Sequence, residues 1–183
     1  GIGADGNYYK NVTITLTAED KGIGVNHTYY RLDGSVWLEY TEPFLVDERG
    51  EHTLEYYSVD YLGHEETVQT ETFNVSNINF KINITSPENG LYVFGKKLLS
   101  MHKTIVVGNI DVEAELVPFD PSVPPEFDQV VFYVDNSSVA TFTSQPFEWN
   151  WEGSAFGKHS LSVTAFNDGD SVTKSVEILI FKF

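Results

Sequence analysis

Hydrophobic and polar side chains alternate along most of the chain with a period of two. The clearest run is residues 12–18, in which Val, Ile, Leu and Ala alternate with three threonines. This period is typical of half-buried β-strands, and β-branched residues suit their pleated surface. Asp33-Gly34, which lies between two further alternating runs, predicts a tight hairpin turn. No stretch of useful length has the 3.6-residue period of a helix, so the pattern predicts an all-β fold.

The chain contains the same pattern twice. An aromatic-x-aliphatic-Asp segment, a Pro-Phe pair and a Gly-x-His segment that ends in leucine occur twice in the same order. They occupy residues 30–33, 43–44 and 50–54, and again residues 132–135, 146–147 and 157–161. Self-similarity in a fixed order indicates two copies of one module. A unit of about 90 residues has the size of an independent β-sandwich.

We therefore predict one β-sandwich domain in residues 1–76 and a second in residues 77–183. The alternating pattern begins late in the first domain, which predicts a missing or reduced first strand. The second domain has two additions, an extra hairpin in residues 92–103 and a Pro-rich loop in residues 118–125. Both are expected to be surface elaborations.

Composition and charge narrow the class of partner. Hydrophobic residues make up 41% of the 183 residues and aromatic residues 14%, which is enough for packed cores. The formal net charge of −16 argues against nucleic acid and anionic membrane surfaces as partners, because both need a basic patch. The absence of cysteine excludes disulfides and thiolate zinc sites. No apolar run reaches the length of a membrane span, and the chain opens on Gly1-Ile2-Gly3, so we expect a piece of a larger protein.

Two parts of the chain resemble known families. Residues 7–75 are similar to bacterial and archaeal cell-surface Ig-like repeats, and residues 80–183 resemble the companion Ig-like module of archaeal surface proteins. The first resemblance rests on residues 11–20, 30–34, 43–44, 50–53 and 57–63, and the second on residues 86–90, 132–135, 146–149 and 155–159. The resemblance implies two tandem immunoglobulin-like (fibronectin III-like) β-sandwich domains, extracellular at the cell surface or secreted. Such modules serve as spacers, adhesive units or accessories of secreted enzymes.

Histidines at matching positions are the first candidates for chemistry. His52 and His159 occupy the same place in the repeat, after Gly-x at the start of a strand. A catalytic interpretation is open to such a pair, but we expect each imidazole to bind loop carbonyls instead. The sequence contains no nucleophile elbow, zinc-protease motif or phosphate-binding glycine loop. We therefore predict that the chain is not an enzyme.

Carboxylates in loops are the candidates for a cation site. Asp20, Asp60 and Glu65 could gather near one another, and oxygen ligands suit Ca²⁺. There is no EF-hand spacing, and solvated loop carboxylates are the commoner explanation. We expect no cofactor, with Ca²⁺ as the alternative.

Aromatic residues are the candidates for ligand binding. If Tyr30 and Tyr56 point inward, then Tyr29 and Tyr57 point outward, and Trp37 can join them. Exposed rings can stack on sugars. The alternative, which we favour, is cross-strand pairing that stabilises the sheet.

The chain also contains five Asn-x-Ser/Thr sequons, which is more than chance predicts and suggests a glycosylated surface protein. The acceptor residues are Asn11, Asn26, Asn74, Asn83 and Asn136.

Together these observations predict a non-catalytic extracellular tandem module that acts as a structural spacer, presentation or adhesion unit of a larger cell-surface protein. Its expected partners are neighbouring domains of the same protein and a surface polysaccharide or protein, with no nucleic acid and no membrane insertion. The alternative function is a carbohydrate-binding accessory module of a secreted hydrolase or protease.

Overall fold

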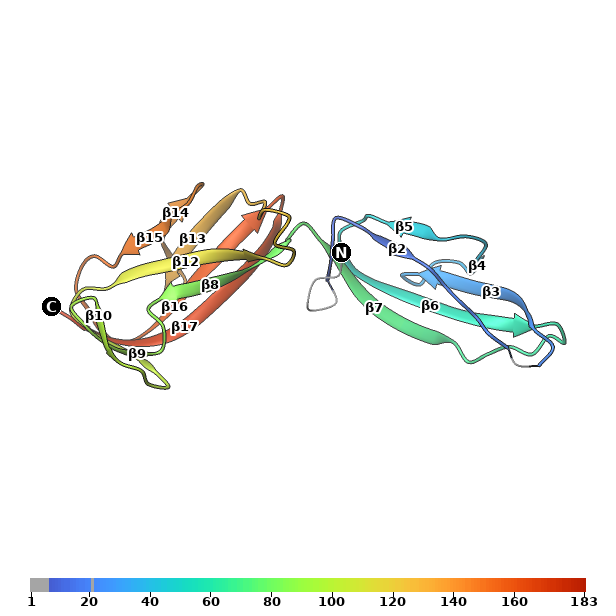
Figure 1. Ribbon diagram of the computed structural model, residues 1–183, viewed down its shortest axis with the longest axis horizontal. Helices are drawn as coiled ribbons and strands as arrows, with labels where there is room; N and C mark the ends of the chain where they lie inside the picture. The colour runs from blue at the N-terminus through green and yellow to red at the C-terminus, as the bar shows by residue number, and fades with distance from the viewer. Residues whose placement is uncertain (1–6, 21) are drawn as a thin grey trace. The chain divides into compact units, whose positions relative to one another are not determined.

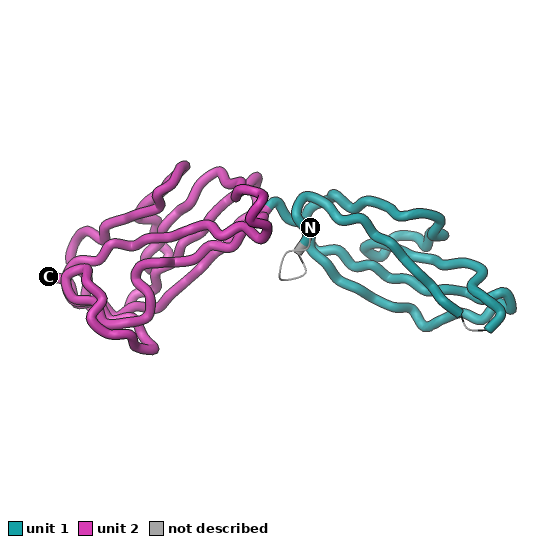
Figure 2. Tube along the Cα trace, in the orientation of Figure 1, with its two compact units in different colours: residues 1–77 teal, residues 78–183 magenta. Residues whose placement is uncertain are grey.

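The computed structural model describes residues 7–20 and 22–183, and these contain strands and no helix. The chain divides into two compact units, Gly1–Asn77 and Ile78–Phe183, as Figure 2 shows. The division lies one residue from the boundary expected from the sequence repeat. Each unit is built from β-sheets (Figure 1), so the all-β prediction is confirmed.

The first unit contains a five-stranded sheet with the order β1-β7-β6-β3-β4 and a two-stranded sheet of β2 and β5. β1 runs parallel to β7, and the other neighbours are antiparallel. The strands are β1 (Asn7–Tyr9), β2 (Val12–Ile14), β3 (Val25–Leu32), β4 (Leu38–Glu39), β5 (Phe44–Val46), β6 (Gly50–Asp60) and β7 (Gln69–Ser76). A small core of Val12, Val46 and Val75 lies between the two layers.

β2 is shorter than the alternating sequence predicts. Its ladder with β5 covers Val12 to Ile14 only, because β5 itself has three residues. The alternation nevertheless continues, since Leu16 is half-buried whereas Thr15 and Thr17 are exposed. The side-chain pattern is therefore that of a longer strand whose pairing partner ends early.

The second unit is larger and has more complete layers. Its seven-stranded sheet has the order β10-β9-β11-β17-β16-β13-β14, and its three-stranded sheet the order β15-β12-β8. The strands are β8 (Phe80–Ser86), β9 (Gly90–Val93), β10 (Lys96–Leu99), β11 (Thr104–Val107), β12 (Asp111–Pro118), β13 (Gln129–Val134), β14 (Ser137–Phe142), β15 (Phe147–Asn150), β16 (Ala155–Asn167) and β17 (Asp170–Lys182). The largest fully buried side chains of its core are Phe80, Phe132 and Phe147.

The extra hairpin of the second unit consists of β9 and β10. Its turn contains Phe94 and Gly95, both with positive φ. At the start of β9, a Cβ on Gly90 would lie 2.5 Å from the carbonyl oxygen of Leu99, so only glycine fits there.

The Pro-rich loop of the second unit is held by one buried side chain. Asn79 is 5% exposed, and its Nδ2 donates to the carbonyl of Pro124 at 2.9 Å. Its Oδ1 accepts from the amide of Glu126 at 3.2 Å, and its backbone carbonyl accepts from the amide of Phe119. A single asparagine just before β8 therefore fixes both ends of the loop.

We predict that Asn79→Ala destabilises the second unit by about 1–3 kcal/mol, because two hydrogen bonds at a buried site are lost together. Urea unfolding measures this change. Asn109→Ala, at an exposed position, is the matched control and should change stability by less than about 0.5 kcal/mol. Equal effects of the two variants would contradict the role given to Asn79.

Candidate functional site

A carboxylate–imidazole pair joins the first hairpin turn to β6. Asp33 and Gly34 both have positive φ, at 52° and 67°, which is the geometry of a type I′ turn. The Asp33 Oδ1 accepts from the amide of Thr53 at 2.7 Å, and its Oδ2 accepts from Nδ1 of His52 at 2.7 Å. Nε2 of His52 lies 2.7 Å from the carbonyl oxygen of Glu48. Because both partners are acceptors, the arrangement favours an imidazolium that donates from both nitrogens.

The second unit repeats this pair with one difference. Asp135, at φ 49°, accepts from the amide of Ser160 at 2.9 Å and from Nδ1 of His159 at 2.6 Å. Nε2 of His159 is buried and has no hydrogen-bond partner. The ring lies edge-on to Trp151, at 5.8 Å between centroids. The Asp135–His159 pair thus has the same aspartate–imidazole hydrogen bond as Asp33–His52. It lacks a counterpart of the Glu48 carbonyl, which His52 contacts through Nε2.

We call these two pairs the turn clamps. The expected histidine–carbonyl contact is correct for His52 and wrong for His159, and the aspartate partners were missed. The signal for them was present, since Asp33 and Asp135 also occupy matching positions in the repeat. Both nitrogens of His52 are engaged, which leaves neither of them to act as a base toward a nucleophile.

The turn clamps shift the pKa values of His52, Asp33 and Asp135. Burial alone would lower the pKa of His52, but its hydrogen bonds to Asp33 and to the Glu48 carbonyl raise it overall. Burial likewise opposes the change at Asp33, whose pKa is lowered by His52 and by the Thr53 amide. The pKa of Asp135 is lowered by the Ser160 amide first and by His159 second.

The candidate cation ligands lie around one cleft. Asp20, Asp60 and Glu65 line a hollow of about 170 Å³ between two loops of the first unit. The Asp20 carboxylate accepts from the amides of Gly22 and Gly24, both at 2.9 Å. Within the ranges 7–20 and 22–183, no group of three or more acidic or histidine side chains has the arrangement of a metal site. The geometry shows loop carboxylates that stabilise their own turns.

The carboxylate of Asp60 likewise accepts hydrogen bonds from its own loop. Its Oδ1 accepts from the amides of Leu62 and His64, and its Oδ2 accepts from Nδ1 of His64 at 2.8 Å. These bonds, the His64 amide first, lower the pKa of Asp60.

The candidate aromatic residues do come together on one face of the first unit. Tyr29 and Tyr57 lie directly opposite each other on β3 and β6 and stack at 5.4 Å between centroids. Trp37 meets Tyr57 edge-on at 4.8 Å, and the guanidinium of Arg31 lies 4.7 Å from the Trp37 ring. Arg31 also donates to both carboxylate oxygens of Glu55, at 2.6 and 2.7 Å. We call these five residues the aromatic cluster.

Stacking between the two tyrosines uses one face of each ring. All three rings are half-buried. The cluster therefore has the geometry of cross-strand packing. On the other face of β3, Tyr30 stacks on Phe44 of β5 at 4.3 Å, as the alternation predicts.

The sequons differ in exposure. Asn11, Asn26 and Asn136 are exposed, whereas Asn74 and Asn83 are half-buried. Nδ2 of Asn83 donates to a carboxylate oxygen of Glu115 at 3.4 Å. Three of the five acceptor side chains are thus well exposed for modification.

Comparison with known proteins concerns the second unit above all. Residues 81–165 match the sequence model of a family described as a bacterial Ig domain. This match covers most of the second unit and confirms its resemblance to Ig-like modules. No curated protein matches the chain. Within the described parts of the chain, no helix has the length and apolar character needed to span a membrane.

Solved structures similar to the chain are fibronectin III-like and Ig-like modules. The fibronectin(III)-like modules of Clostridium thermocellum CbhA are 17% identical, with 96% of this chain and 88% of that chain covered and a TM-score of 0.41. The D00-D0 domain of intimin is 11% identical, with 98% of each chain covered and a TM-score of 0.33. A chimeric titin Z1Z2 tandem is 12% identical, with 95% and 92% covered and a TM-score of 0.34.

We predict that His52→Gln destabilises the first unit most between about pH 4 and pH 6.5, by about 2 kcal/mol. A histidine whose pKa is raised on folding stabilises fully below its unfolded pKa of about 6.5, and this contribution is lost as pH rises through the folded pKa. The lowered pKa of Asp33 acts oppositely: its contribution is present above about pH 3.9 and is lost as pH falls through the folded pKa.

Urea unfolding of the wild type and of His52→Gln from pH 4 to pH 9 measures this difference. His102→Gln, at an exposed loop position, is the matched control. A stability difference that stays constant over this range would show that the clamp is not ionic.

Proposed function

We propose that this chain is a non-catalytic extracellular pair of Ig-like modules that acts as a structural spacer, presentation or adhesion unit of a larger cell-surface protein. Ig-like and fibronectin III-like families typically lack catalysis, and bacterial Ig domains are typically found on cell-surface or secreted proteins. The acidic composition and the exposed sequons support a location outside the cell. The proposed partners are neighbouring domains of the same protein and a surface polysaccharide or protein.

The observation that carries this proposal is the parallel pairing of the first strand with the last strand in the first unit. Asn7 to Tyr9 pair there with Asn74 to Ser76. In the second unit the last strand also has a parallel partner, Thr104 to Val107 of β11, but that unit begins with β8, which pairs antiparallel with β12. A pull on the two ends of the first unit moves its parallel strands in opposite directions. Their hydrogen bonds are then loaded together in shear rather than one after another, which suits a module that transmits tension.

The hydrogen bonds that polar side chains make to turns and loops support the same proposal. Asp33, His52 and Asp60 each hold a turn or loop in place. Asp135 and His159 do the same in the second unit. Groups that could serve in catalysis are thus engaged in fixing the loops at the ends of the strands.

Single-molecule force spectroscopy tests the mechanical role. Pulled from its two ends, the chain should show two unfolding events, and extension of residues 7–76 should release roughly 25 nm of contour length before the folded length is subtracted. The reason is that the two units are separate compact units and that the parallel pair of the first unit must rupture as a whole. The chain has no cysteine, so engineered anchors are unique.

The matched control changes only the direction of the pull. Anchoring at Ser35→Cys instead of the N-terminus applies force at the end of the sheet where β7 also ends, because Leu32 pairs with Leu54 and Gly50 with Val75. The hydrogen bonds between β3, β6 and β7 should then break one after another, at a lower unfolding force than in the end-to-end pull. Equal forces in the two geometries would argue against a spacer that resists tension.

A second candidate function is carbohydrate binding, as an accessory module of a secreted hydrolase or protease. It rests on the aromatic cluster, whose three rings lie together on one face.

Binding of the purified chain to soluble glycans and insoluble polysaccharides, with and without Ca²⁺, tests this function. We expect no saturable binding, because the rings of Tyr29 and Tyr57 pack on each other. Saturable binding that is lost in Tyr29→Ala/Tyr57→Ala, but retained in Tyr61→Ala at an exposed loop position, would instead establish a recognition module. A requirement for Ca²⁺ would implicate Asp20, Asp60 and Glu65.

A further inference from the structure

The seven-stranded sheet of the second unit has apolar side chains on both of its faces. Tyr92, Val106 and Ile180 point into the core and are at most 6% exposed. Because side chains alternate along a strand, their neighbours in sequence point to the opposite, outer face. On that face lie half-buried or exposed apolar side chains of four adjacent strands: Leu91, Val93, Ile105, Val107, Phe156, Leu179 and Phe181. We call these seven residues the outer apolar face.

The outer apolar face is continuous from strand to strand. In the order β9, β11, β17, one row is Leu91, Ile105 and Leu179, and the next row is Val93, Val107 and Phe181. Phe156 extends the second row onto β16, where its ring meets Phe181 edge-on at 5.0 Å between centroids. Within the described chain, none of the seven belongs to the core cluster of the unit or packs against it. A contiguous apolar surface of this kind marks an interaction site.

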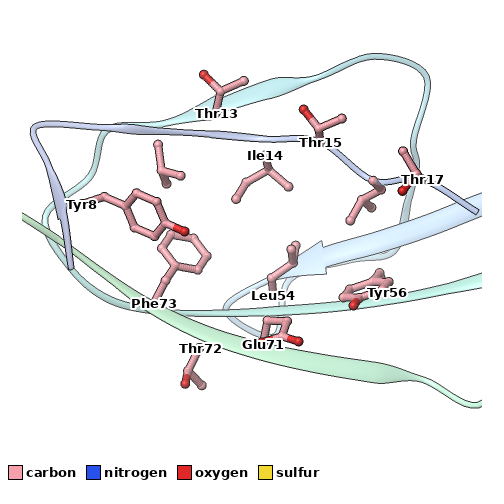
Figure 3. Close-up of a pocket in the computed structure, with 12 residues that line it drawn as sticks. Tyr8, Thr13, Ile14, Thr15, Thr17, Leu54, Tyr56, Glu71, Thr72 and Phe73 are labelled. Atoms are coloured by element: carbon pink, nitrogen blue, oxygen red, sulfur yellow. The ribbon is translucent and has the colours of Figure 1, made fainter. Parts of the chain in front are cut away.

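The fold itself does not require an apolar outer face, as the first unit shows. His52 of the first unit pairs with Phe73, and its counterpart His159 pairs with Ile178. Figure 3 shows Phe73 directed into the space between the layers of the first unit and Thr72 directed away from it. By this register, polar residues of the first unit match three members of the face: Arg49 matches Phe156, Asn74 matches Leu179 and Ser76 matches Phe181. The apolar side chains are therefore specific to the second unit.

Two opposite charges lie next to each other at one margin of the outer apolar face. Thr104 of β11 lies beside Ile178 of β17, and both point inward, at 2% exposure. By the same register, the residues that precede them, Lys103 and Glu177, lie side by side on the outer face. Both side chains are exposed, and within the described residues neither forms an ion pair. Both charges are thus available to a partner.

We propose that the outer apolar face binds a second copy of the chain, sheet to sheet, about a two-fold axis that runs parallel to the strands between β11 and β17. Such an axis sets β11 of one copy over β17 of its partner. Ile105 then faces Leu179 of the partner, and Lys103 faces Glu177 of the partner. Each contact forms twice, as in every isologous interface, and sheets pack face to face with their strands aligned in this way. This goes beyond a spacer, because it makes the second unit a joint between two copies.

Charge favours a second copy as the occupant. Lys103 and Glu177 lie on either side of the axis, so the face is electrostatically complementary to itself. Elsewhere a second copy meets repulsion, because the chain has a net charge of −16. Lys158, which lies beside Leu179, is at the margin of the face, where its ammonium reaches solvent while its stem covers Leu91 of the partner.

The area of the face also suits a dimer. Four strands about 4.8 Å apart and three rows about 6.8 Å apart span about 400 Å². Since side chains make the surface rough, two such faces bury about 1,000 Å² in total, which is the lower end of the range for stable interfaces. We therefore expect a weak dimer, with a Kd in the micromolar range.

Sedimentation equilibrium of the full chain over a range of concentrations measures this Kd. Lys103→Glu and Glu177→Lys should each weaken dimerisation by about tenfold or more, because each variant sets like charges against each other twice. A one-to-one mixture of the two variants should recover the affinity of the wild type, because every such contact then joins opposite charges. This recovery requires a second copy in the proposed geometry.

Leu179→Ser tests the apolar part of the face and should also weaken dimerisation by about tenfold or more. Val139→Ser is the matched control, since Val139 is exposed on β14 of the same sheet and lies outside the face. Thermal midpoints establish that the variants are folded. A wild type that stays monomeric at every concentration, dimers that persist unchanged in both charge variants, or a mixture that does not recover would each overturn the proposal.

Discussion

The same aspartate–histidine hydrogen bond anchors one hairpin turn in each unit, at Asp33 and at Asp135. An aspartate in a left-handed conformation at the start of a hairpin turn accepts hydrogen bonds from an amide and an imidazole of the third strand after that turn, β6 or β16. The carboxylate ties its hairpin turn to this long strand. The register of β6 and β16, and with it the placing of their inward-facing leucines, depends on this contact.

The rest of each unit follows from that register. Once β6 and β16 are in place, β7 and β17 pair along them and close onto β1 and β11 in parallel. The polar groups are used to hold turns, and the apolar groups fill the layers.

Much of this could be predicted from the sequence, because alternation and turn residues are local signals. The all-β fold, the Asp33-Gly34 turn and the inward direction of Tyr30 follow from period and turn chemistry. The aspartate partners of His52 and His159 were missed because they are distant in sequence, although the repeat contained them. The early end of β2 depends on the length of its partner β5, and the alternation within residues 12–18 does not report how long that partner is.

The unsatisfied Nε2 of His159 has a consequence for how the two copies can diverge. The core of the second unit contains sixteen buried residues among those described, against three in the first. A large core supplies a stability reserve, so the loss of one polar contact is tolerated there. The core of the first unit is smaller, so the same loss would remove a larger share of its stability. Substitutions in the repeated motif should therefore be tolerated less well in the first unit than in the second.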